Sequence, residues 1–262
     1  MTLIRRFSPI ARTLFSLAIA TACGAIALAL SFPANAATCN IAVAANFTEP
    51  AREIAQVFET KTGHKALLSF GATGQFYAQM TQAAPFEAFL SADESTPKRL
   101  VDGGLAVADS LFTYAVGKLV LFSAQTGLVT GEQTLRDPKF TKIAIANPLT
   151  APYGAAAVET MKSLGVYEAL SNRIVQGNDI AQTFQFVDTG NAELGFVALS
   201  QVIMRQGGSR WIVSANLYRP IRQDAVLLRN GAENEAAKAF LAFLKGPEAN
   251  TVIEKFGYTA KS

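Results

Sequence analysis

Four short stretches of small or polar residues have the composition and position of an anion site. They cover residues 44–47, 71–74, 151–154 and 177–180 and read Ala-Ala-Asn-Phe, Gly-Ala-Thr-Gly, Ala-Pro-Tyr-Gly and Gly-Asn-Asp-Ile. Each follows an apolar, strand-like run and precedes a segment with helical spacing. The first N–H groups of a helix have no intrahelical partner, so converging helix N-termini bind an anion without Lys or Arg. The four stretches therefore predict an anion-binding site.

One residue in each stretch is a candidate contact, and each also has an ordinary structural explanation. Asn46 offers an N–H and a side-chain amide to a crevice, or it caps the next helix. Thr73 offers an N–H and a hydroxyl, or it belongs to a capping turn. Tyr153, between a proline and a glycine, favours a phenol that faces a cleft over one in the core. Ile180 offers only its N–H, and periodicity alone favours simple packing of its side chain.

Alternating strands and helices must position these residues. We expect strands at residues 40–45, 66–70, 86–91, 143–146, 173–176 and 194–198, and helices at 49–62, 74–81, 95–102, 154–164, 181–189, 233–244 and 247–256. Two further apolar strands, 118–123 and 224–229, bracket the second group of elements and are expected to cross between two lobes. This order predicts an α/β fold of two doubly wound lobes, with a ligand cleft between them at the carboxyl ends of parallel strands.

Residues 1–36 are expected to form a cleavable signal peptide. A head with three arginines precedes the apolar run 14–30, and Ala-Asn-Ala at 34–36 is a typical cleavage signal. Pro33 and the small residues after it favour cleavage over a transmembrane anchor. Lipid attachment at Cys23 is disfavoured because the residues after it stay apolar. These features predict a periplasmic protein.

Charge and cysteine counts argue against nucleic-acid and metal-cation binding. The chain has 23 Lys and Arg against 20 Asp and Glu, and removal of the three leader arginines leaves 20 against 20. No basic patch remains for nucleic acid. Of the two cysteines, Cys39 alone lies beyond the leader, which excludes an intramolecular disulfide in the mature chain. The one histidine, His64, is expected in a solvated turn after a helix, so no free metal cation is expected to bind.

An enzyme is also disfavoured. A hydrolase would need a nucleophile with a base, but the sequence has no G-x-S-x-G elbow and only one histidine. Asp93 and Glu94 are the only tempting carboxylate pair, and adjacent residues seldom converge on one substrate atom. A sensor domain or an adhesion module with the same fold remains an alternative to a solute carrier.

Several sequence blocks, in order, carry a family resemblance. They are residues 43–47, 89–94, 112–121, 146–148 with 151–154, 194–198 and 244–247. From Asn40 onward the chain thus resembles the periplasmic molybdate-binding proteins of ABC-type transporters, in the subgroup with Ala-Pro-Tyr-Gly. The resemblance implies a type II periplasmic-binding-protein fold that closes over molybdate or tungstate and delivers it to an ABC permease. From the two expected crossing strands we place the first lobe at 37–119 plus 226–262 and the second at 120–225, and we expect a monomer without a cofactor.

The resemblance assigns the ligand contacts to the four candidates. Asn46 is expected to give backbone and side-chain donors, Thr73 its hydroxyl and N–H, and Tyr153 and Ile180 mainly backbone N–H groups. Two positions depart from the pattern of some members, because this chain has Ala45 in place of a hydroxyl residue and Ala198 in place of a tyrosine. The number of donors therefore differs from those members.

Such a donor set suits a fully deprotonated tetrahedral dianion. The ion has only acceptor atoms, so N–H and O–H groups satisfy it, whereas a buried carboxylate would repel it. Monoprotonated phosphate carries a hydrogen that needs an acceptor and is disfavoured. Sulfate and thiosulfate remain alternatives, since cavity size must separate sulfate from molybdate.

Overall fold

The computed structural model describes residues 36–137 and 139–260. The expected signal peptide, apart from Ala36, and the lipidation candidate Cys23 lie outside the described residues. None of the helices in the described ranges has the length and apolar character needed to cross a membrane.

The first sheet has six strands in the order β11-β4-β10-β3-β1-β2. Their bounds are β1 Thr38–Ala44, β2 Lys65–Gly71, β3 Ala88–Leu90, β4 Phe112–Gly117, β10 Ile221–Leu227 and β11 Thr259–Ala260. β1 is parallel to β2 and β3, with Ala44 opposite Gly71, so the first two candidate stretches begin side by side. β10 is antiparallel to β3 and β4, and β11 pairs with the other edge of β4.

The second sheet has five strands in the order β7-β6-β8-β5-β9. Their bounds are β5 Leu119–Ser123, β6 Ile143–Ala146, β7 Ile174–Gly177, β8 Leu194–Ala198 and β9 Ser209–Ile212. β6 is parallel to β7 and β8, whereas β5 is antiparallel to β8 and β9. The carboxyl ends of β6 and β7 therefore lie at one edge of the sheet, where the third and fourth candidate stretches follow.

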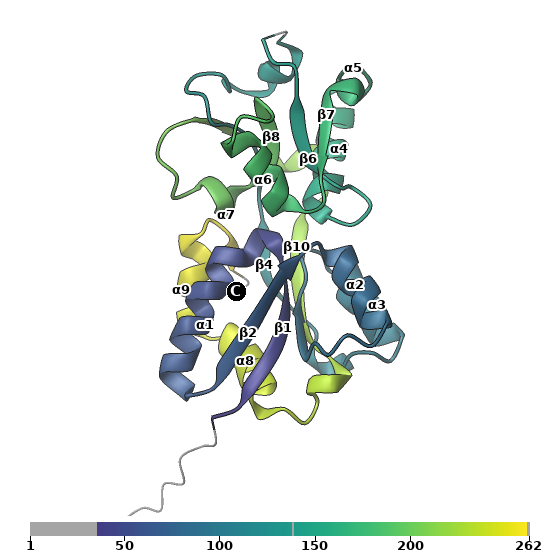
Figure 1. The fold of residues 1–262 in the computed structure, drawn as a ribbon, viewed down its shortest axis with the longest axis vertical. Helices are drawn as coiled ribbons and strands as arrows, with labels where there is room; N and C mark the ends of the chain where they lie inside the picture. Colours follow the sequence, from purple (N-terminus) through teal and green to yellow (C-terminus); the bar gives the residue numbers. More distant parts are fainter. Residues whose placement is uncertain (1–35, 138, 261–262) are drawn as a thin grey trace, which may run out of the picture. The chain divides into compact units, whose positions relative to one another are not determined.

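Helices cover both faces of each sheet (Figure 1). With the first sheet pack α1 Thr48–Thr62, α2 Thr73–Thr81, α3 Ser95–Asp102, α8 Glu235–Leu244 and α9 Pro247–Lys255. With the second pack α4 Pro152–Ser163, α5 Tyr167–Leu170, α6 Ile180–Asp188 and α7 Leu199–Val202. We call these groups the first lobe and the second lobe. The α/β fold class expected from the sequence is confirmed.

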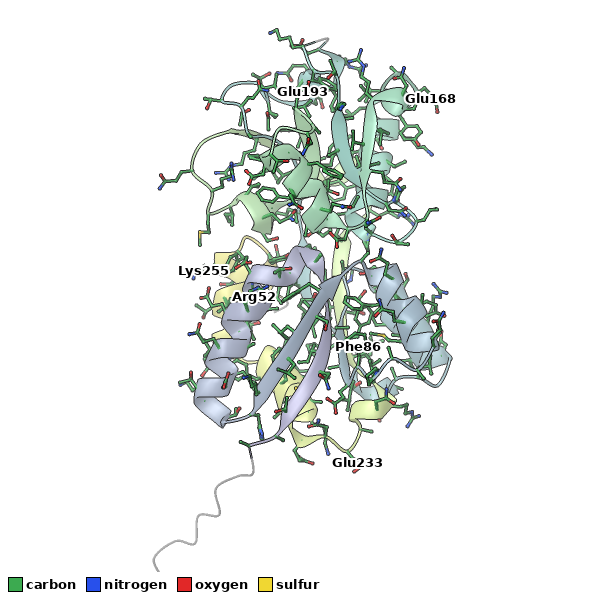
Figure 2. All side chains as sticks on the ribbon, in the orientation of Figure 1. Arg52, Phe86, Glu168, Glu193, Glu233 and Lys255 are labelled. Atoms are coloured by element: carbon green, nitrogen blue, oxygen red, sulfur yellow. The ribbon has the colours of Figure 1, made fainter. Side chains whose placement is uncertain are left out.

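The core follows the alternation of strand side chains. In β1, Ile41 and Val43 belong to the core beneath α1, α8 and α9, whereas Ala42 joins Phe76 and Leu100 beneath α2 and α3. Successive residues of a strand face opposite sides, so one strand serves both cores. Charged side chains such as Glu168 and Glu233 are exposed (Figure 2).

The chain passes between the sheets twice. Lys118 alone separates β4 of the first sheet from β5 of the second, and residues 213–220 return the chain from β9 to β10. The two passages are joined, because Leu119 N–H donates to the Tyr218 hydroxyl at 3.1 Å. The expectation that the strand at 224–229 crosses is wrong: its residues up to 227 lie in β10, which pairs within the first sheet. The division at 119/120 and 225/226 stays a prediction.

Candidate functional site

All four predicted contact residues line one small cavity between the lobes. Asn46 follows β1 in the short 3₁₀ helix η2 (Ala45–Phe47), and Thr73 is the first residue of α2. Tyr153 and Ile180 lie in the first turns of α4 and α6 in the second lobe. Each of the four residues is at most 3% exposed. The structure thus brings together the four stretches that the sequence singled out.

The backbone N–H groups of these residues are available to a ligand. Helix starts leave their first N–H groups without intrahelical acceptors, and this applies to Thr73, Tyr153 and Ile180. Within residues 36–137 and 139–260, no hydrogen bond uses the N–H of any of these three residues or of Asn46. Four donors from two lobes therefore have no acceptor in the described protein.

The Thr73 hydroxyl is oriented by the protein. Its Oγ1 accepts the Ala92 N–H at 3.0 Å, and the residue is 2% exposed. Since the oxygen is already used as an acceptor, its own proton remains for another group. This arrangement agrees with the expected hydroxyl donor.

The side-chain amide of Asn46 is engaged inside the protein. Its Nδ2 donates to Gln223 Oε1 and to the Tyr258 hydroxyl, both at 2.9 Å. Both amide protons are thus used, and the expectation of a side-chain donor to a ligand does not agree with this geometry. What Asn46 offers the cavity as a donor is its backbone N–H. The sequence analysis did not identify Gln223 and Tyr258 as partners, because they lie 177 and 212 residues after Asn46.

The sequence predicts a Tyr153 phenol that faces an open cleft, and this prediction is wrong. The residue is 1% exposed, and its hydroxyl accepts a hydrogen bond from Gln223 Nε2 at 3.3 Å. Burial raises the pKa of Tyr153 well above its usual value, and neighbouring Tyr258 adds to the rise. Tyr153 can therefore offer a ligand in the cavity only its backbone N–H. Its neutral side chain bonds Gln223 of β10 and so holds the start of α4 in place.

The described cavity lining contains no Lys, Arg or His. Alanine is its most frequent residue, as at Ala45 and Ala92, and one carboxylate, Asp179, belongs to it. Asp179 caps α6, because its Oδ1 accepts the Gln182 N–H at 2.9 Å. Sequence reasoning gave Asp179 no role, although an Asp directly before a helix is a typical N-cap. Within the described residues, no cluster of His, Cys, Asp and Glu is suited to a metal ion.

The two lobes touch beside the cavity. Gly74 N–H donates to the Thr150 carbonyl at 2.8 Å, which joins the start of α2 to the loop before α4. A Cβ added at Gly74 would lie 3.0 Å from the Thr150 Cα. Glycine is therefore needed here for the close approach of two backbones.

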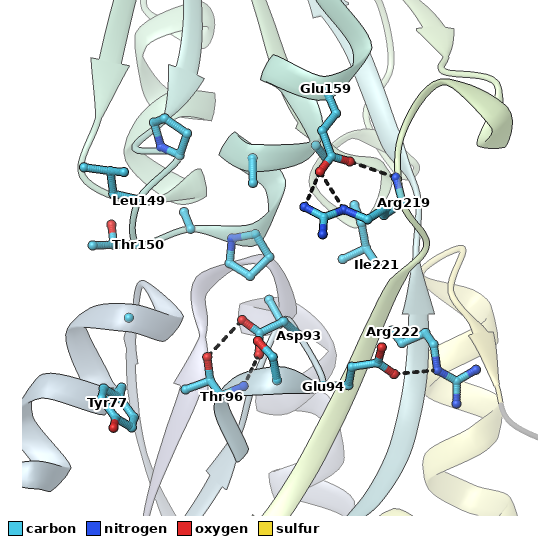
Figure 3. Close-up of a pocket in the computed structure, with 18 of the residues that line it drawn as sticks. Tyr77, Asp93, Glu94, Thr96, Leu149, Thr150, Glu159, Arg219, Ile221 and Arg222 are labelled. Atoms are coloured by element: carbon cyan, nitrogen blue, oxygen red, sulfur yellow. Dashed lines mark hydrogen bonds and ion pairs between the residues drawn. The ribbon is translucent and has the colours of Figure 1, made fainter. Parts of the chain in front are cut away.

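A larger groove beside this contact is lined by paired charges (Figure 3). Glu94 pairs with Arg222 at 3.0 Å, and Glu159 with Arg219. Asp93 accepts the Thr96 N–H in the first turn of α3 at 2.7 Å. Partial burial would raise the pKa of Glu159, but the hydrogen bonds and charge of Arg219 lower it. Asp93 and Glu94 thus have separate structural partners, which argues against a joint acid/base role.

His64 is half-buried rather than fully solvated. It follows Gly63 at the end of α1, its Nδ1 accepts the Ala37 N–H at 3.1 Å, and its ring stacks on Phe58. These contacts explain the single histidine as a structural residue, and it is not part of the cavity lining.

Comparison with known proteins identifies similar chains over nearly the whole described length. The profile of the family described as bacterial extracellular solute-binding protein matches residues 39–259. The molybdate-binding protein ModA of Rhodobacter capsulatus is 55% identical, over 90% of this chain and 94% of that protein. ModA of Azotobacter vinelandii is 53% identical, over 94% of this chain and 98% of that protein.

A solved structure is also similar. The periplasmic molybdate-binding protein of Azotobacter vinelandii superposes with a TM-score of 0.83 and 40% sequence identity, covering 86% of this chain and 100% of that one.

Proposed function

Since the chain belongs to the family of bacterial extracellular solute-binding proteins, we propose that it binds molybdate in the cavity between its lobes. Such proteins bind and release a solute without converting it, so the chain is not an enzyme. The ligand is cargo, and no cofactor is part of the proposal. The name and identity of the relatives support molybdate in particular.

The convergence of four unpartnered N–H groups on one cavity carries this proposal. Asn46 and Thr73 supply donors from the first lobe, and Tyr153 and Ile180 supply them from the second. The Thr73 hydroxyl adds a fifth donor, because its oxygen already accepts from Ala92. An ion whose surface consists only of acceptor oxygens satisfies such donors, and a buried N–H without an acceptor is costly.

Capture by closure follows from the position of the donors on both lobes. In an open form the anion meets the donors of one lobe; rotation about the two passages then brings the others, and water is excluded. Exclusion of water strengthens each donor contact. The closed protein is then recognised by an ABC-type permease at the periplasmic face of the membrane. Tungstate, with the same charge and shape, is expected to bind in the same way.

A ligand panel tests the proposal. Thermal unfolding of the mature protein is measured with molybdate, tungstate, sulfate, thiosulfate, phosphate and chromate at equal concentrations. A ligand that binds only the native state raises the midpoint with the logarithm of its excess over Kd. We expect molybdate and tungstate to give the largest shifts. A shift with sulfate or thiosulfate but none with molybdate would contradict molybdate as the ligand and assign the site to another tetrahedral oxyanion.

A further inference from the structure

Behind the cavity, buried polar side chains form a connected network. Gln223, which has no exposed surface, accepts hydrogen bonds at its Oε1 from Asn46 Nδ2 and from the Tyr114 hydroxyl. Its Nε2 donates to the Tyr153 hydroxyl at 3.3 Å. Both the oxygen and the nitrogen of the Gln223 amide are thus hydrogen-bonded. The Tyr258 hydroxyl meets Asn46 from the other side, since it accepts from Asn46 Nδ2 and lies 2.7 Å from the Asn46 carbonyl.

The network crosses between the lobes. Gln223, Asn46 and Tyr258 belong to the first lobe, whereas Tyr153 starts α4 of the second. A second link comes from Ser200 in α7, whose Oγ donates to the Asn46 carbonyl at 2.8 Å. Two residues that line the cavity, Asn46 and Tyr153, are therefore joined through Gln223 by their side-chain polar groups.

The backbone is shaped to accommodate this link. The register between β10 and β4 shifts between Gln223 and Asp224, which interrupts the ladder where the Gln223 side chain enters the network. Gly117, at the end of β4, leaves room for it: an added Cβ would lie 2.6 Å from Gln223 Nε2 and even closer to the Tyr153 hydroxyl. Gly117 also directly precedes the passage into the second lobe at Lys118.

We propose that Gln223 and the Tyr153 hydroxyl are positioning groups that hold the lobes closed around the ligand. Neither needs to touch the anion. Their bond exists only while the start of α4 lies against β10, so opening must separate a buried donor from its acceptor. Loss of the bond therefore lowers the barrier to opening and speeds ligand release. The inference rests on the proposed function, because its main measurement follows bound molybdate.

Release kinetics test the proposal. Protein loaded with molybdate is diluted into excess tungstate, and the molybdenum retained is measured over time. Tyr153→Phe removes the hydroxyl and keeps the backbone N–H, and Gln223→Met keeps the length of the side chain without its amide. Tyr153→Phe is expected to release molybdate about tenfold faster, the effect of losing one buried hydrogen bond. Gln223→Met is expected to release it at least as fast, because it also removes the acceptor of Asn46 Nδ2 and of the Tyr114 hydroxyl. The double variant should be no faster than the faster single one, since both substitutions break the same link.

A matched control separates positioning from general destabilisation. Thr160→Val removes a buried hydroxyl from the same helix, where it bonds only the Ala156 carbonyl. This variant should keep the wild-type release rate even if its unfolding midpoint falls. The proposal is overturned if Tyr153→Phe and Gln223→Met release molybdate at the wild-type rate, or if their effects multiply in the double variant.

Failure of the proposed function has a different signature. If the wild-type protein retains none of the oxyanions in the panel, molybdate binding fails, and the link is judged without ligand. Urea unfolding of wild type, both single variants and the double variant then measures coupling between Tyr153 and Gln223. Coupled losses would uphold the interlobe bond, and additive losses would overturn it.

Discussion

The Thr73 hydroxyl has its acceptor side fixed by the Ala92 N–H at 3.0 Å, which leaves its proton for a ligand. Thr73→Val removes the donor and also leaves Ala92 N–H without this acceptor. We expect molybdate affinity to fall by about 1–3 kcal/mol, the usual cost of an unmade buried hydrogen bond. Isothermal titration calorimetry measures the change directly.

Thr73→Ser serves as the control for this substitution. It keeps the hydroxyl and loses only a methyl group, so it should bind molybdate within a few-fold of the wild-type affinity. Unchanged affinity in Thr73→Val would remove this hydroxyl from the site.

Tyr258 gives a pH dependence whose sign is fixed by burial. Burial raises the pKa of Tyr258 from 10.0 to about 12, against the opposing effect of its hydrogen bonds with Ser200 and Asn46. Between these two values the folded protein holds the proton more tightly than the unfolded chain. The contribution of Tyr258 to the free energy of unfolding is therefore complete below pH 10. It falls as pH rises toward 12, by about 1.4 kcal/mol per pH unit for one tyrosine.

Urea unfolding at a series of pH values between 8 and 11.5 checks this dependence. Tyr114 and Tyr153, whose pKa values burial also raises, add to the slope. Tyr258→Phe should flatten the alkaline decline relative to wild type. A variant as steep as the wild type would show that Tyr258 does not contribute.

Residue types predicted the location of the site better than the direction of its side chains. The cavity is lined by all four predicted residues, Asn46, Thr73, Tyr153 and Ile180. They could be predicted because a helix start after a strand is a local sequence pattern. Whether the Asn46 amide faces a ligand depends on Gln223 and Tyr258, which are distant in sequence. No local spacing reveals such partners.

At the scale of elements, the contact between α2 and the loop before α4 sets how closely the lobes approach. Gly74→Ala places a methyl group 3.0 Å from the Thr150 Cα and 3.2 Å from its carbonyl oxygen. These are backbone atoms that cannot rotate away, so the closed arrangement loses about 1–3 kcal/mol by overpacking. Molybdate affinity should fall about tenfold or more, as measured by calorimetry.

Gly103→Ala is the matched control. Its added methyl meets the Arg99 carbonyl at 3.2 Å inside the first lobe, so it disturbs packing to a similar degree without touching the second lobe. If both variants lose the same affinity, the contact between Gly74 and Thr150 has no special role in closure.

Periodicity predicted the longer elements and missed those defined by pairing alone. The strand at 143–146 and the helix at 95–102 agree with β6 and α3 to the residue. The sequence analysis did not predict β4 or β9. β4 lies among other apolar residues that hide its bounds. β9 reads Ser-Arg-Trp-Ile, which is not an apolar run, and it is defined by its pairing with the buried strand β5. The assignment of β10 to the first sheet likewise depends on its distant partners β3 and β4.

At the scale of the molecule, alternation of strands and helices was enough to predict two α/β lobes. It did not reveal where the chain crosses, since Lys118 is a single residue between two apolar strands. The passages lie together, with Val213 N–H and Leu119 carbonyl 3.0 Å apart. Their adjacency limits the lobes to rotation about one narrow region.

The absence of Lys, Arg and His from the described cavity lining has an electrical consequence. Binding without proton uptake adds the full charge of the anion to the protein, and no cationic side chain of the described lining offsets that charge locally. The loaded protein should therefore migrate faster toward the anode in a native gel than the empty one. A partner that senses charge as well as shape could distinguish the two forms before any contact is made.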